Sequence, residues 1–318
     1  MVKRKAEEEI RKMWNHGERW LRGALIGKVM AVKSAELFAS ESIQHEAEVL
    51  FEIKACCPFI IERFGKETTT TTDKGDKVYK LLLEYAAGGT LDGLIQRSNG
   101  HGLPEAHVKT YTRCILEGLI HIPKCGYIHC DRKPENILLA PTYSTTTSSF
   151  VAKIADFGLS KRSKEKYSGW RGTPRYLSPE ALKVMKQDQS SDIWSLDCIV
   201  FEMLVGKSSW ELKPGCSDRV DILDVTMLDH PRTSRIRAEI SYVAGDFLEI
   251  CLAMRPEKRL TAKELLSHPF VVQPQPIKPA LGQAYGICFL KPSAKYHASV
   301  AIASRIQPTL GFGIRSGV

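Results

Sequence analysis

The stretch with the densest chemistry is HCDRKPENILL, which begins at His129. It offers a carboxylate at Asp131, an ammonium group at Lys133 and an amide at Asn136, next to an apolar run typical of a strand. The tripeptide DFG, beginning at Asp156, follows Asn136 by twenty residues and closes a second such run. A hairpin of these two strands would bring Asn136 and Asp156 together. Their oxygens would suit Mg²⁺, a hard cation that takes carboxylate and phosphate oxygens.

These side chains suit the transfer of a phosphoryl group. The reaction needs little covalent chemistry from the protein and depends on positioning and on neutralisation of charge. Asp131 would face the hydroxyl group that accepts the phosphate. The pattern therefore predicts a phosphoryl-transfer enzyme whose chemistry is gathered at the ends of two strands.

Seven motifs, in order along the chain, resemble the signature set of the protein kinases. They are MAVK ending at Lys33, Glu46 in the next helix, HCDRKPEN, DFG, SPE, DIWSL and RLTAKELLSHPF. The resemblance covers roughly residues 17–271. LLLEYAAGGTL, IHCDRKPENILL and RGTPRYLSPE are most similar to plant mitogen-activated protein kinase kinase kinases of the MEKK-like branch. The resemblance implies a serine/threonine kinase that uses ATP and Mg²⁺.

On the nucleotide side, the resemblance implies that Lys33 contacts the α- and β-phosphates and pairs with Glu46. Glu48 is the alternative partner, but Glu46 is preferred because the apolar Leu50 follows it by four positions. Gly27 is the glycine that remains of a phosphate-binding loop, although its simplest role is that of a turn glycine.

The resemblance also places the adenine. Leu83 would stand at the gatekeeper position, which is equally compatible with simple core packing. The backbone from Glu84 to Ala86 would meet the adenine ring.

On the transfer side, the resemblance implies that Asp131 orients the substrate hydroxyl and that Lys133 steadies the transferred phosphate. Asn136 and Asp156 would hold magnesium. A lysine at position 133 is typical of kinases that act on serine or threonine.

Four further residues receive supporting roles from the resemblance. Thr173 would contact the catalytic aspartate and the substrate backbone. Glu180 would form a buried ion pair with Arg259, and Asp192 would cap the catalytic loop from a buried helix.

Two departures from the family lie close to the catalytic residues. Cys130 stands where many kinases have an arginine that pairs with a phosphorylated activation loop. We therefore expect loop phosphorylation at Ser163, Tyr167 or Ser168 to be dispensable. Arg132 and Asp197 stand where relatives have an aliphatic residue and a glycine, and each would cost about 1–3 kcal/mol unless it reaches solvent or a partner.

The third departure is in WLRGALIGKVMAVKS, residues 20–34. A kinase glycine loop needs GxGxxG so that backbone N–H groups approach the phosphates. Lys33 follows Gly27 by only six positions, whereas two short strands and their turns need roughly 15 residues. The loop tip and the second strand cannot both be present, so the lid over the phosphates and one wall of the adenine pocket would be missing.

The elements that must position these residues indicate an α+β, bilobal kinase-like fold. Strands at 30–37 and 77–85, a helix at 40–53 and a polar hairpin loop at 66–77 predict a small β-rich lobe. Helices at 104–126, 190–206 and 261–270 predict a larger helical lobe, with strands at 136–140 and 151–156 joined by a loop at 141–150. Paired glycines in EYAAGGT would give a hinge between the lobes. The predicted regions are a charged arm (1–16), a small lobe (17–87), a large lobe (88–271) and a basic, flexible tail (272–318).

Composition sets outer limits on function. Of the net charge of +9, five charges come from the tail, so the charge is weak evidence for a nucleic-acid partner, and we expect none. The nine cysteines show no disulfide or zinc framework, which favours the cytosol or nucleus. No apolar run is long enough for a membrane helix. We expect a monomer.

Two functions remain open on the sequence. The first is an ATP-dependent kinase that phosphorylates a mitogen-activated protein kinase kinase in a stress or hormone cascade. The alternative is a catalytically weak pseudokinase that acts as a binding or scaffold module, because its glycine loop is incomplete.

Overall fold

The computed structural model describes residues 19–25, 28–53, 57–70, 75–143, 148–165, 171–207 and 240–272. These residues divide into two compact units. The smaller unit holds the residues up to 43 together with 64–85, and the larger holds 44–63 together with those from 86 onward. Within the described ranges, no helix is both long and apolar enough to cross a membrane.

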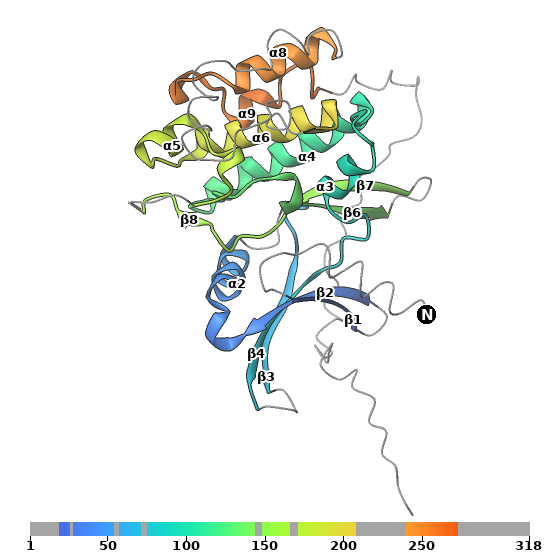
Figure 1. Cartoon of the computed structure of the whole chain (residues 1–318), viewed down its shortest axis with the longest axis vertical. Helices are drawn as coiled ribbons and strands as arrows, with labels where there is room; N and C mark the ends of the chain where they lie inside the picture. Colours follow the sequence, from blue (N-terminus) through green and yellow to red (C-terminus); the bar gives the residue numbers. More distant parts are fainter. Residues whose placement is uncertain are drawn as a thin grey trace, which may run out of the picture. The chain divides into compact units, whose positions relative to one another are not determined.

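The smaller unit is built on a four-stranded sheet in the order β1-β2-β4-β3 (Figure 1). Its strands are β1 (Arg19–Leu25), β2 (Lys28–Glu36), β3 (Arg63–Thr70) and β4 (Lys77–Glu84), and a 3-10 turn, η1 (Leu37–Ala39), follows β2. Both β1 and β4 pair with β2 in antiparallel register. Met30 and Val32 of β2 pack with Leu82 and Phe64 on one face of the sheet. Side chains alternate along a strand, so Lys33 lies on the opposite face.

β1 and β2 flank the short glycine segment and are separated by two residues. β1 pairs directly with the strand that carries Lys33, and Leu25 lies opposite Lys28. In the described part of the chain, β1 alone precedes that strand, as the length argument requires. Gly27 lies outside the described residues.

The prediction of a polar loop at 66–77 is wrong for its first part. β3 continues to Thr70, and its side chains alternate between half-buried and exposed. Threonine is β-branched and favours extended backbone, so a polar threonine run can extend a strand as well as form a loop.

The larger unit is mainly helical. Its helices are α2 (Glu41–Ile53, in this unit from residue 44), α3 (Leu91–Gln96), α4 (Glu105–Lys124), α5 (Pro179–Val184), α6 (Gln189–Val205), α8 (Tyr242–Cys251) and α9 (Ala262–Leu265). Its strands form two pairs, β5 (Tyr127–Ile128) with β8 (Lys161–Arg162) and β6 (Ile137–Tyr143) with β7 (Ser148–Ile154). Three 3-10 turns complete it, η2 (Pro134–Asn136), η3 (Pro174–Tyr176) and η5 (Pro256–Lys258).

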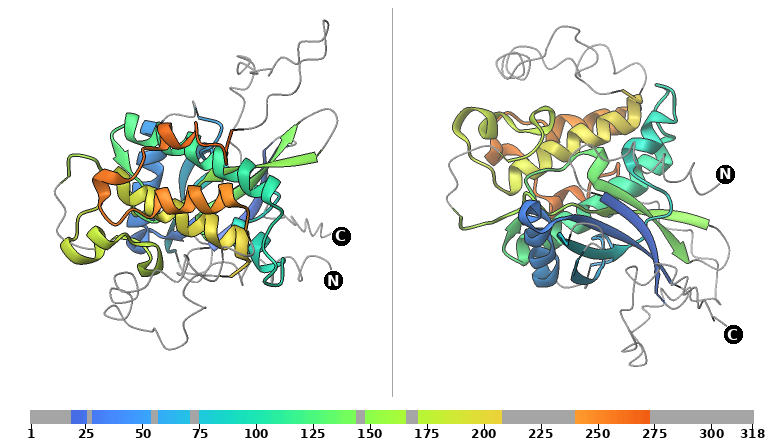
Figure 2. Two further views of the ribbon diagram at one scale, coloured as in Figure 1. Left: turned by 90° about the horizontal axis from the view of Figure 1, so that it is seen from above. Right: turned by 60° about the horizontal axis from the view of Figure 1, so that its bottom comes forward.

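Helix α6 forms the centre of this unit, as its nearly continuous apolar sequence predicts. It packs against α4 and α8, and Figure 1 shows it between them; Figure 2 gives two further views of these helices. The side chains from Ser191 to Met203 are all buried. Asp188 and Ser191 form a capping box at its start, and Gly206 ends it in the left-handed conformation.

Three boundaries in this unit differ from the sequence prediction. β6 and β7 extend to Tyr143 and from Ser148, so most of the expected loop at 141–150 is strand. Helix α9 covers only 262–265 of the predicted 261–270, and Pro269 prevents a long continuation. Helix α4 ends as predicted, with Gly126 at a φ of 82°.

The paired glycines are anchored to β6, which the hinge prediction did not anticipate. The Gly88 N–H donates to the Leu139 carbonyl at 2.9 Å, and the Leu139 N–H donates to the Gly89 carbonyl at 2.8 Å. A Cβ at Gly88 would lie 2.7 Å from the Leu139 Cβ. Position 88 therefore requires glycine because the chain passes close to Leu139. Position 89 favours glycine because its φ is 78°.

Candidate active site

The centre of the candidate site is the carboxylate of Asp131, in the loop between β5 and η2. One oxygen, Oδ1, accepts hydrogen bonds from the backbone N–H and the hydroxyl of Thr173, both at 2.8 Å. The other, Oδ2, accepts from Nδ2 of Asn136 at 3.2 Å and lies 3.3 Å from Nζ of Lys133. Nζ of Lys133 also donates to the Thr173 hydroxyl at 3.0 Å. Four residues predicted separately are thus joined in one network.

Asn136 and Asp156 lie at the adjoining ends of β6 and β7. The Ala155 N–H donates to the Asn136 carbonyl at 2.9 Å, which places Asp156 next to Asn136 in the hairpin. Nδ2 of Asn136 also donates to the Asp131 carbonyl at 2.8 Å, so its amide oxygen is turned away from Asp131. Asp156 has a φ of 62°, a strained value for a residue other than glycine and typical of functional sites.

This donor set fits Mg²⁺ bound together with a nucleotide. It supplies one carboxylate and one amide oxygen, and Mg²⁺ in nucleotide sites takes one or two carboxylates and completes its shell with phosphate and water. Among the described residues, no group of three or more His, Cys, Asp or Glu side chains could hold a metal ion alone. Asn136 and Asp156 would therefore bind the ion jointly with phosphate oxygens.

His129 is a neutral ring that links the catalytic loop to the DFG segment through hydrogen bonds at both ring nitrogens. Its Nδ1 accepts the Asp131 N–H at 3.3 Å, so the proton is on Nε2, which donates to the Ala155 carbonyl at 3.0 Å. Burial lowers the pKa of His129 to about 4, and the charge of Arg132 adds to this. The ring packs on Phe157 of DFG, with centroids 4.7 Å apart. One residue thus connects the catalytic loop to the DFG segment that follows β7.

Glu46 reaches the DFG segment within the larger unit. Its Oε1 accepts the Phe157 N–H at 3.2 Å, and its side chain is fully buried, whereas Glu48 is exposed. This favours Glu46 over Glu48 as the functional glutamate. Lys33 is also fully buried but belongs to the smaller unit, so its pairing with Glu46 stays a prediction.

For the residues predicted to contact adenine, the structure gives burial and backbone contacts only. Leu83 is buried in β4, and Glu84, the last residue of that strand, is half-buried. The Ala86 carbonyl accepts the Gly89 N–H at 3.1 Å in the turn that follows. Their contacts with adenine stay predictions, as does the role of Gly27.

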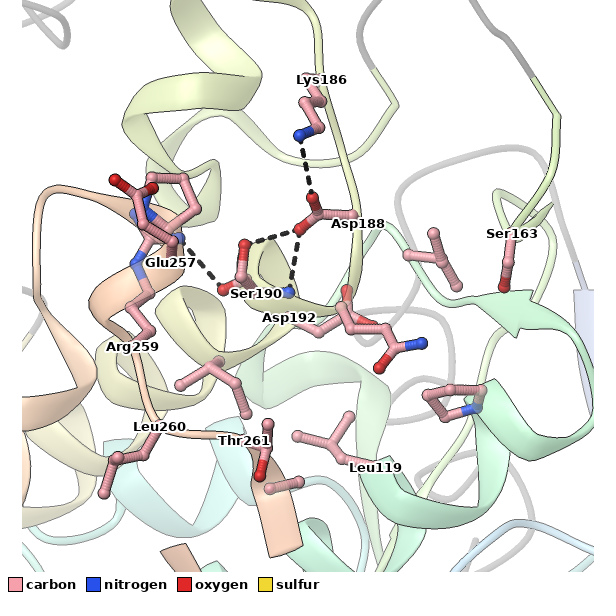
Figure 3. Close-up of a pocket in the computed structure, with 16 residues that line it drawn as sticks. Leu119, Ser163, Lys186, Asp188, Ser190, Asp192, Glu257, Arg259, Leu260 and Thr261 are labelled. Carbon is pink, nitrogen blue, oxygen red and sulfur yellow. Dashed lines mark hydrogen bonds and ion pairs between the residues drawn. The ribbon is translucent and has the colours of Figure 1, made fainter. Parts of the chain in front are cut away.

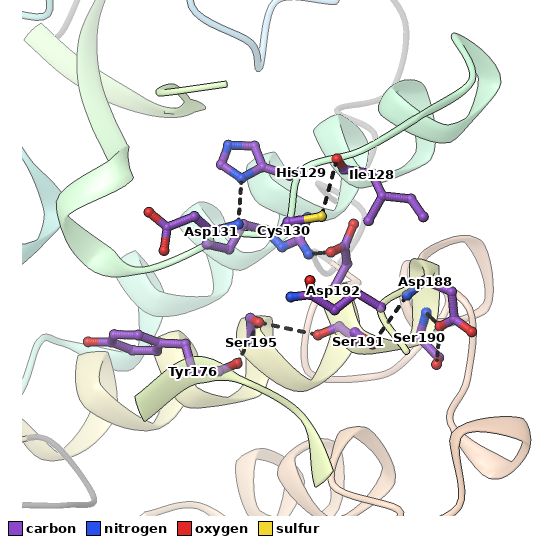
Figure 4. Close-up of polar contacts among 12 residues, drawn as sticks. Ile128, His129, Cys130, Asp131, Tyr176, Asp188, Ser190, Ser191, Asp192 and Ser195 are labelled. Carbon is purple, nitrogen blue, oxygen red and sulfur yellow. Dashed lines mark hydrogen bonds and ion pairs between the residues drawn. The ribbon is translucent and has the colours of Figure 1, made fainter. Parts of the chain in front are cut away.

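Asp192 contacts the catalytic loop through Arg132, a residue that the family pattern does not contain at this position. It lies in the first turn of α6 (Figure 4). It forms an ion pair with the guanidinium of Arg132, and both side chains are buried. Nε and Nη1 of Arg132 make no hydrogen bond with any described residue. Burial lowers the pKa of Arg132 to about 9. Arg132 therefore has a partner but is incompletely satisfied.

Asp197, the other unusual charge, does not reach solvent. It is fully buried on α6, and its charge adds to burial in raising the pKa of Cys251 on α8. Asp197 therefore belongs to the core of the larger unit rather than to its surface.

Glu180 and Arg259 form the ion pair that the resemblance implies. Nη1 and Nη2 of Arg259 donate to the two carboxylate oxygens at 2.6 and 2.8 Å. The guanidinium also donates to the carbonyls of Ala253 and Ser190. Bonds to Arg259 lower the pKa of Glu180 even though burial opposes this.

Sequence reasoning missed Gly172, which precedes Thr173. Its φ is 105°, and a Cβ there would lie 2.3 Å from the Cys130 carbonyl oxygen. The glycine lets two loops approach closely enough for Thr173 to reach Asp131. The only sequence signal was its place in RGTPRY.

The larger unit also has a pocket of about 570 Å³ away from this network. Leu119, Ile193 and Leu260 give it apolar walls, and Lys186, Asp188 and Glu257 supply charge (Figure 3). Asp192 and Arg259 are among its lining residues, whereas Asp131, Asn136 and Asp156 are not, so the pocket borders the supporting ion pairs and not the predicted transfer site.

Comparison with known proteins identifies the class. The family model of the protein kinase domain matches residues 21–271, so the chain belongs to the protein kinase family. Mitogen-activated protein kinase kinase kinase 20 of Arabidopsis thaliana is 36% identical over 249 residues, which cover 76% of this chain and 69% of that protein.

Two further Arabidopsis thaliana relatives extend this result. Mitogen-activated protein kinase kinase kinase 17 is 34% identical over 82% of this chain and 72% of that protein. Mitogen-activated protein kinase kinase kinase 18 is 38% identical over 79% of this chain and 72% of that protein. The predicted resemblance to plant kinases of this MEKK-like group is confirmed, and these relatives give no support to the pseudokinase alternative.

Proposed function

We propose that this protein is a serine/threonine kinase that uses Mg·ATP to phosphorylate a mitogen-activated protein kinase kinase in a stress or hormone signalling cascade. The observation that carries the proposal is the network in which Asp131, Lys133, Asn136 and Thr173 converge. The names of the relatives supply the substrate class. The signalling context is an expectation from the resemblance alone.

The residues divide the work by charge and position. Asp131 would accept a hydrogen bond from the substrate hydroxyl and orient it, while Thr173 holds that carboxylate in place. Lys133 would place a positive charge beside the phosphoryl group in transfer. Asn136 and Asp156 would hold Mg²⁺, which neutralises the nucleotide phosphates when it is bound. Lys33 would contact the phosphates from the smaller unit.

The test compares the parent protein with Asp156→Ala and, as a matched control, with Asp76→Ala at an exposed aspartate. Transfer of labelled phosphate from ATP to a kinase-inactive mitogen-activated protein kinase kinase is measured, together with Mg·ATP binding. We expect transfer by the parent and the control and at least about a 100-fold loss in Asp156→Ala, since one electrostatic contact to the transition state is removed. A parent protein that neither binds Mg·ATP nor transfers phosphate would contradict the proposal.

A further inference from the structure

Cys130 removes the usual anchor of a phosphorylated activation loop. Its thiol lies 3.7 Å from the Ile128 carbonyl, and burial raises its pKa to about 11. The side chain is therefore neutral and offers no charge to a loop phosphate. The segment that follows DFG needs another source of order if Thr173 is to stay at Asp131.

Glu165 supplies a negative charge within that segment. Its Oε1 accepts a hydrogen bond from Nη2 of Arg171 at 3.0 Å. Its Oε2 accepts the Arg162 N–H at 3.3 Å, and its own N–H donates to the Arg162 carbonyl at 3.0 Å. One carboxylate thus connects the stretch that begins at β8 with the stretch that leads to Thr173.

Both the side chain and the backbone of Arg171 make further hydrogen bonds. Its Nη1 donates to the Ser160 carbonyl at 3.0 Å. Its backbone N–H donates to the Gln187 side chain at 3.3 Å, and the Gln187 amide donates back to the Arg171 carbonyl at 2.7 Å. Gln187 is buried, so these bonds are shielded from water.

The same segment is attached to α2. Nε2 of His45 lies 2.7 Å from the Ser160 carbonyl, so it is the protonated nitrogen and donates to it. Nη2 of Arg162 pairs with Glu52 at 2.7 Å. The helix that carries Glu46 therefore contacts both β8 and the residue that precedes it.

Arg171 lies two residues before Thr173, which contacts the catalytic carboxylate of Asp131. Gly172 packs on the Cys130 carbonyl, and Thr173 donates twice to Asp131. A displacement of Arg171 would therefore be transmitted to the catalytic carboxylate through a single glycine.

We propose that Glu165, acting through Arg171, orders the activation segment in place of a loop phosphate and so presents Thr173 to Asp131. The inference rests on the proposed function, and Glu165 and Arg171 are positioning residues. It also gives the expected independence from loop phosphorylation a structural cause. Of the three expected phosphosites, Ser163 is exposed, and Tyr167 and Ser168 lie outside the described residues.

A plain surface ion pair is the competing explanation. The side chains of Arg171 and Glu165 are 20% and 38% exposed, and such pairs contribute little to global stability. The two explanations differ in what they predict for Thr173, so global stability cannot separate them but turnover and local exchange can.

The test uses Glu165→Gln beside Glu117→Gln, a matched control in the half-buried Arg113–Glu117 pair of α4. We expect Glu165→Gln to lower kcat about 10-fold, to leave KM for ATP within twofold and the Tm within 2 °C, and to speed amide hydrogen exchange across 171–177. The control should change none of these. Glu165→Arg should be as defective, and adding Arg171→Glu should recover at least threefold in kcat.

Phosphatase treatment and Ser163→Ala should each leave at least half of the parent kcat. The inference is overturned if Glu165→Gln keeps the parent kcat and exchange, if it loses ATP binding along with turnover, or if phosphatase abolishes activity. If the parent transfers no phosphate, the proposed function fails, and the exchange measurement alone still decides whether Glu165 orders the segment.

Discussion

Arg132 is a charged residue in surroundings that suit its charge poorly. It is buried, one of its nitrogens pairs with Asp192, and two others have no hydrogen bond among the described residues. Breaking a buried pair on one side leaves an uncompensated charge, whereas removing both charges is often neutral. The pair therefore holds the catalytic loop on α6 without being the most stable solution for that site.

A double-mutant cycle tests this interpretation. We expect Asp192→Asn to destabilise the fold by about 3 kcal/mol, because Arg132 is left charged and buried. Adding Arg132→Leu, which restores an aliphatic residue, should recover more than half of that loss. Urea unfolding measures each variant. Additive effects of the two substitutions would contradict the coupling.

His129 predicts a dependence of stability on pH. Its pKa falls from 6.5 to about 4 on folding, so the unfolded chain binds the proton more tightly between these values. The contribution of His129 is fully present above pH 6.5 and is lost as the pH falls toward 4, by about 3 kcal/mol in total. His129→Gln, which keeps a donor for the Ala155 carbonyl, should flatten this part of the profile. His101→Gln, at an exposed histidine, is the control, and an unchanged profile in His129→Gln would show that other groups dominate.

At the scale of elements, the shortened segment before Lys33 gives a direct prediction. β1 pairs with β2 through a two-residue connection, which leaves no room for a glycine loop. Inserting a complete glycine hairpin between Gly27 and Val29 should lower KM for ATP by about 10-fold, since backbone N–H groups would reach the phosphates. An insert of equal length with valine in place of glycine is the control. Equal kinetics for both inserts would show that the missing loop does not limit nucleotide use.

The helices and strands were predictable where local sequence decides them. The apolar run of α6 and the stop at Gly126 are local signals, and both are confirmed. The extension of β3 to Thr70 was missed because threonine suits loops and strands alike. The extensions of β6 and β7 were missed for the same reason, since serine and threonine are common at their ends.

The candidate site was predictable from ordered motifs but its supporting contacts were not. Asp131, Asn136 and Thr173 occupy recognisable motifs, and the structure brings them together. The pair of Arg132 with Asp192 depends on how α6 packs beneath the loop, and the pair of Glu165 with Arg171 on how the segment folds back. Contacts between residues far apart in sequence have no local signal.

At the scale of the whole molecule, the kinase region ends before the basic tail begins. The family match ends at residue 271, and Phe270 is fully buried against Phe247 of α8. The excess positive charge is unevenly divided, because the residues after Val272 contain five Lys or Arg and no Asp or Glu. More than half of the net charge therefore lies outside the residues that the kinase family model matches.

A chain that ends at Val272 tests this separation. It lowers the formal net charge from +9 to +4 by removing five basic residues and no acid. We expect kcat/KM within twofold of the parent and a Tm within about 3 °C, a shift that corresponds to roughly 1 kcal/mol for a domain of this size. Elution from heparin should move to lower salt, because binding to a polyanion depends on the number of basic groups. A chain in which only those five basic residues are replaced by Gln is the control for charge. A larger fall in Tm on truncation than in that control would show that apolar tail segments such as SVAIAS stabilise the kinase region.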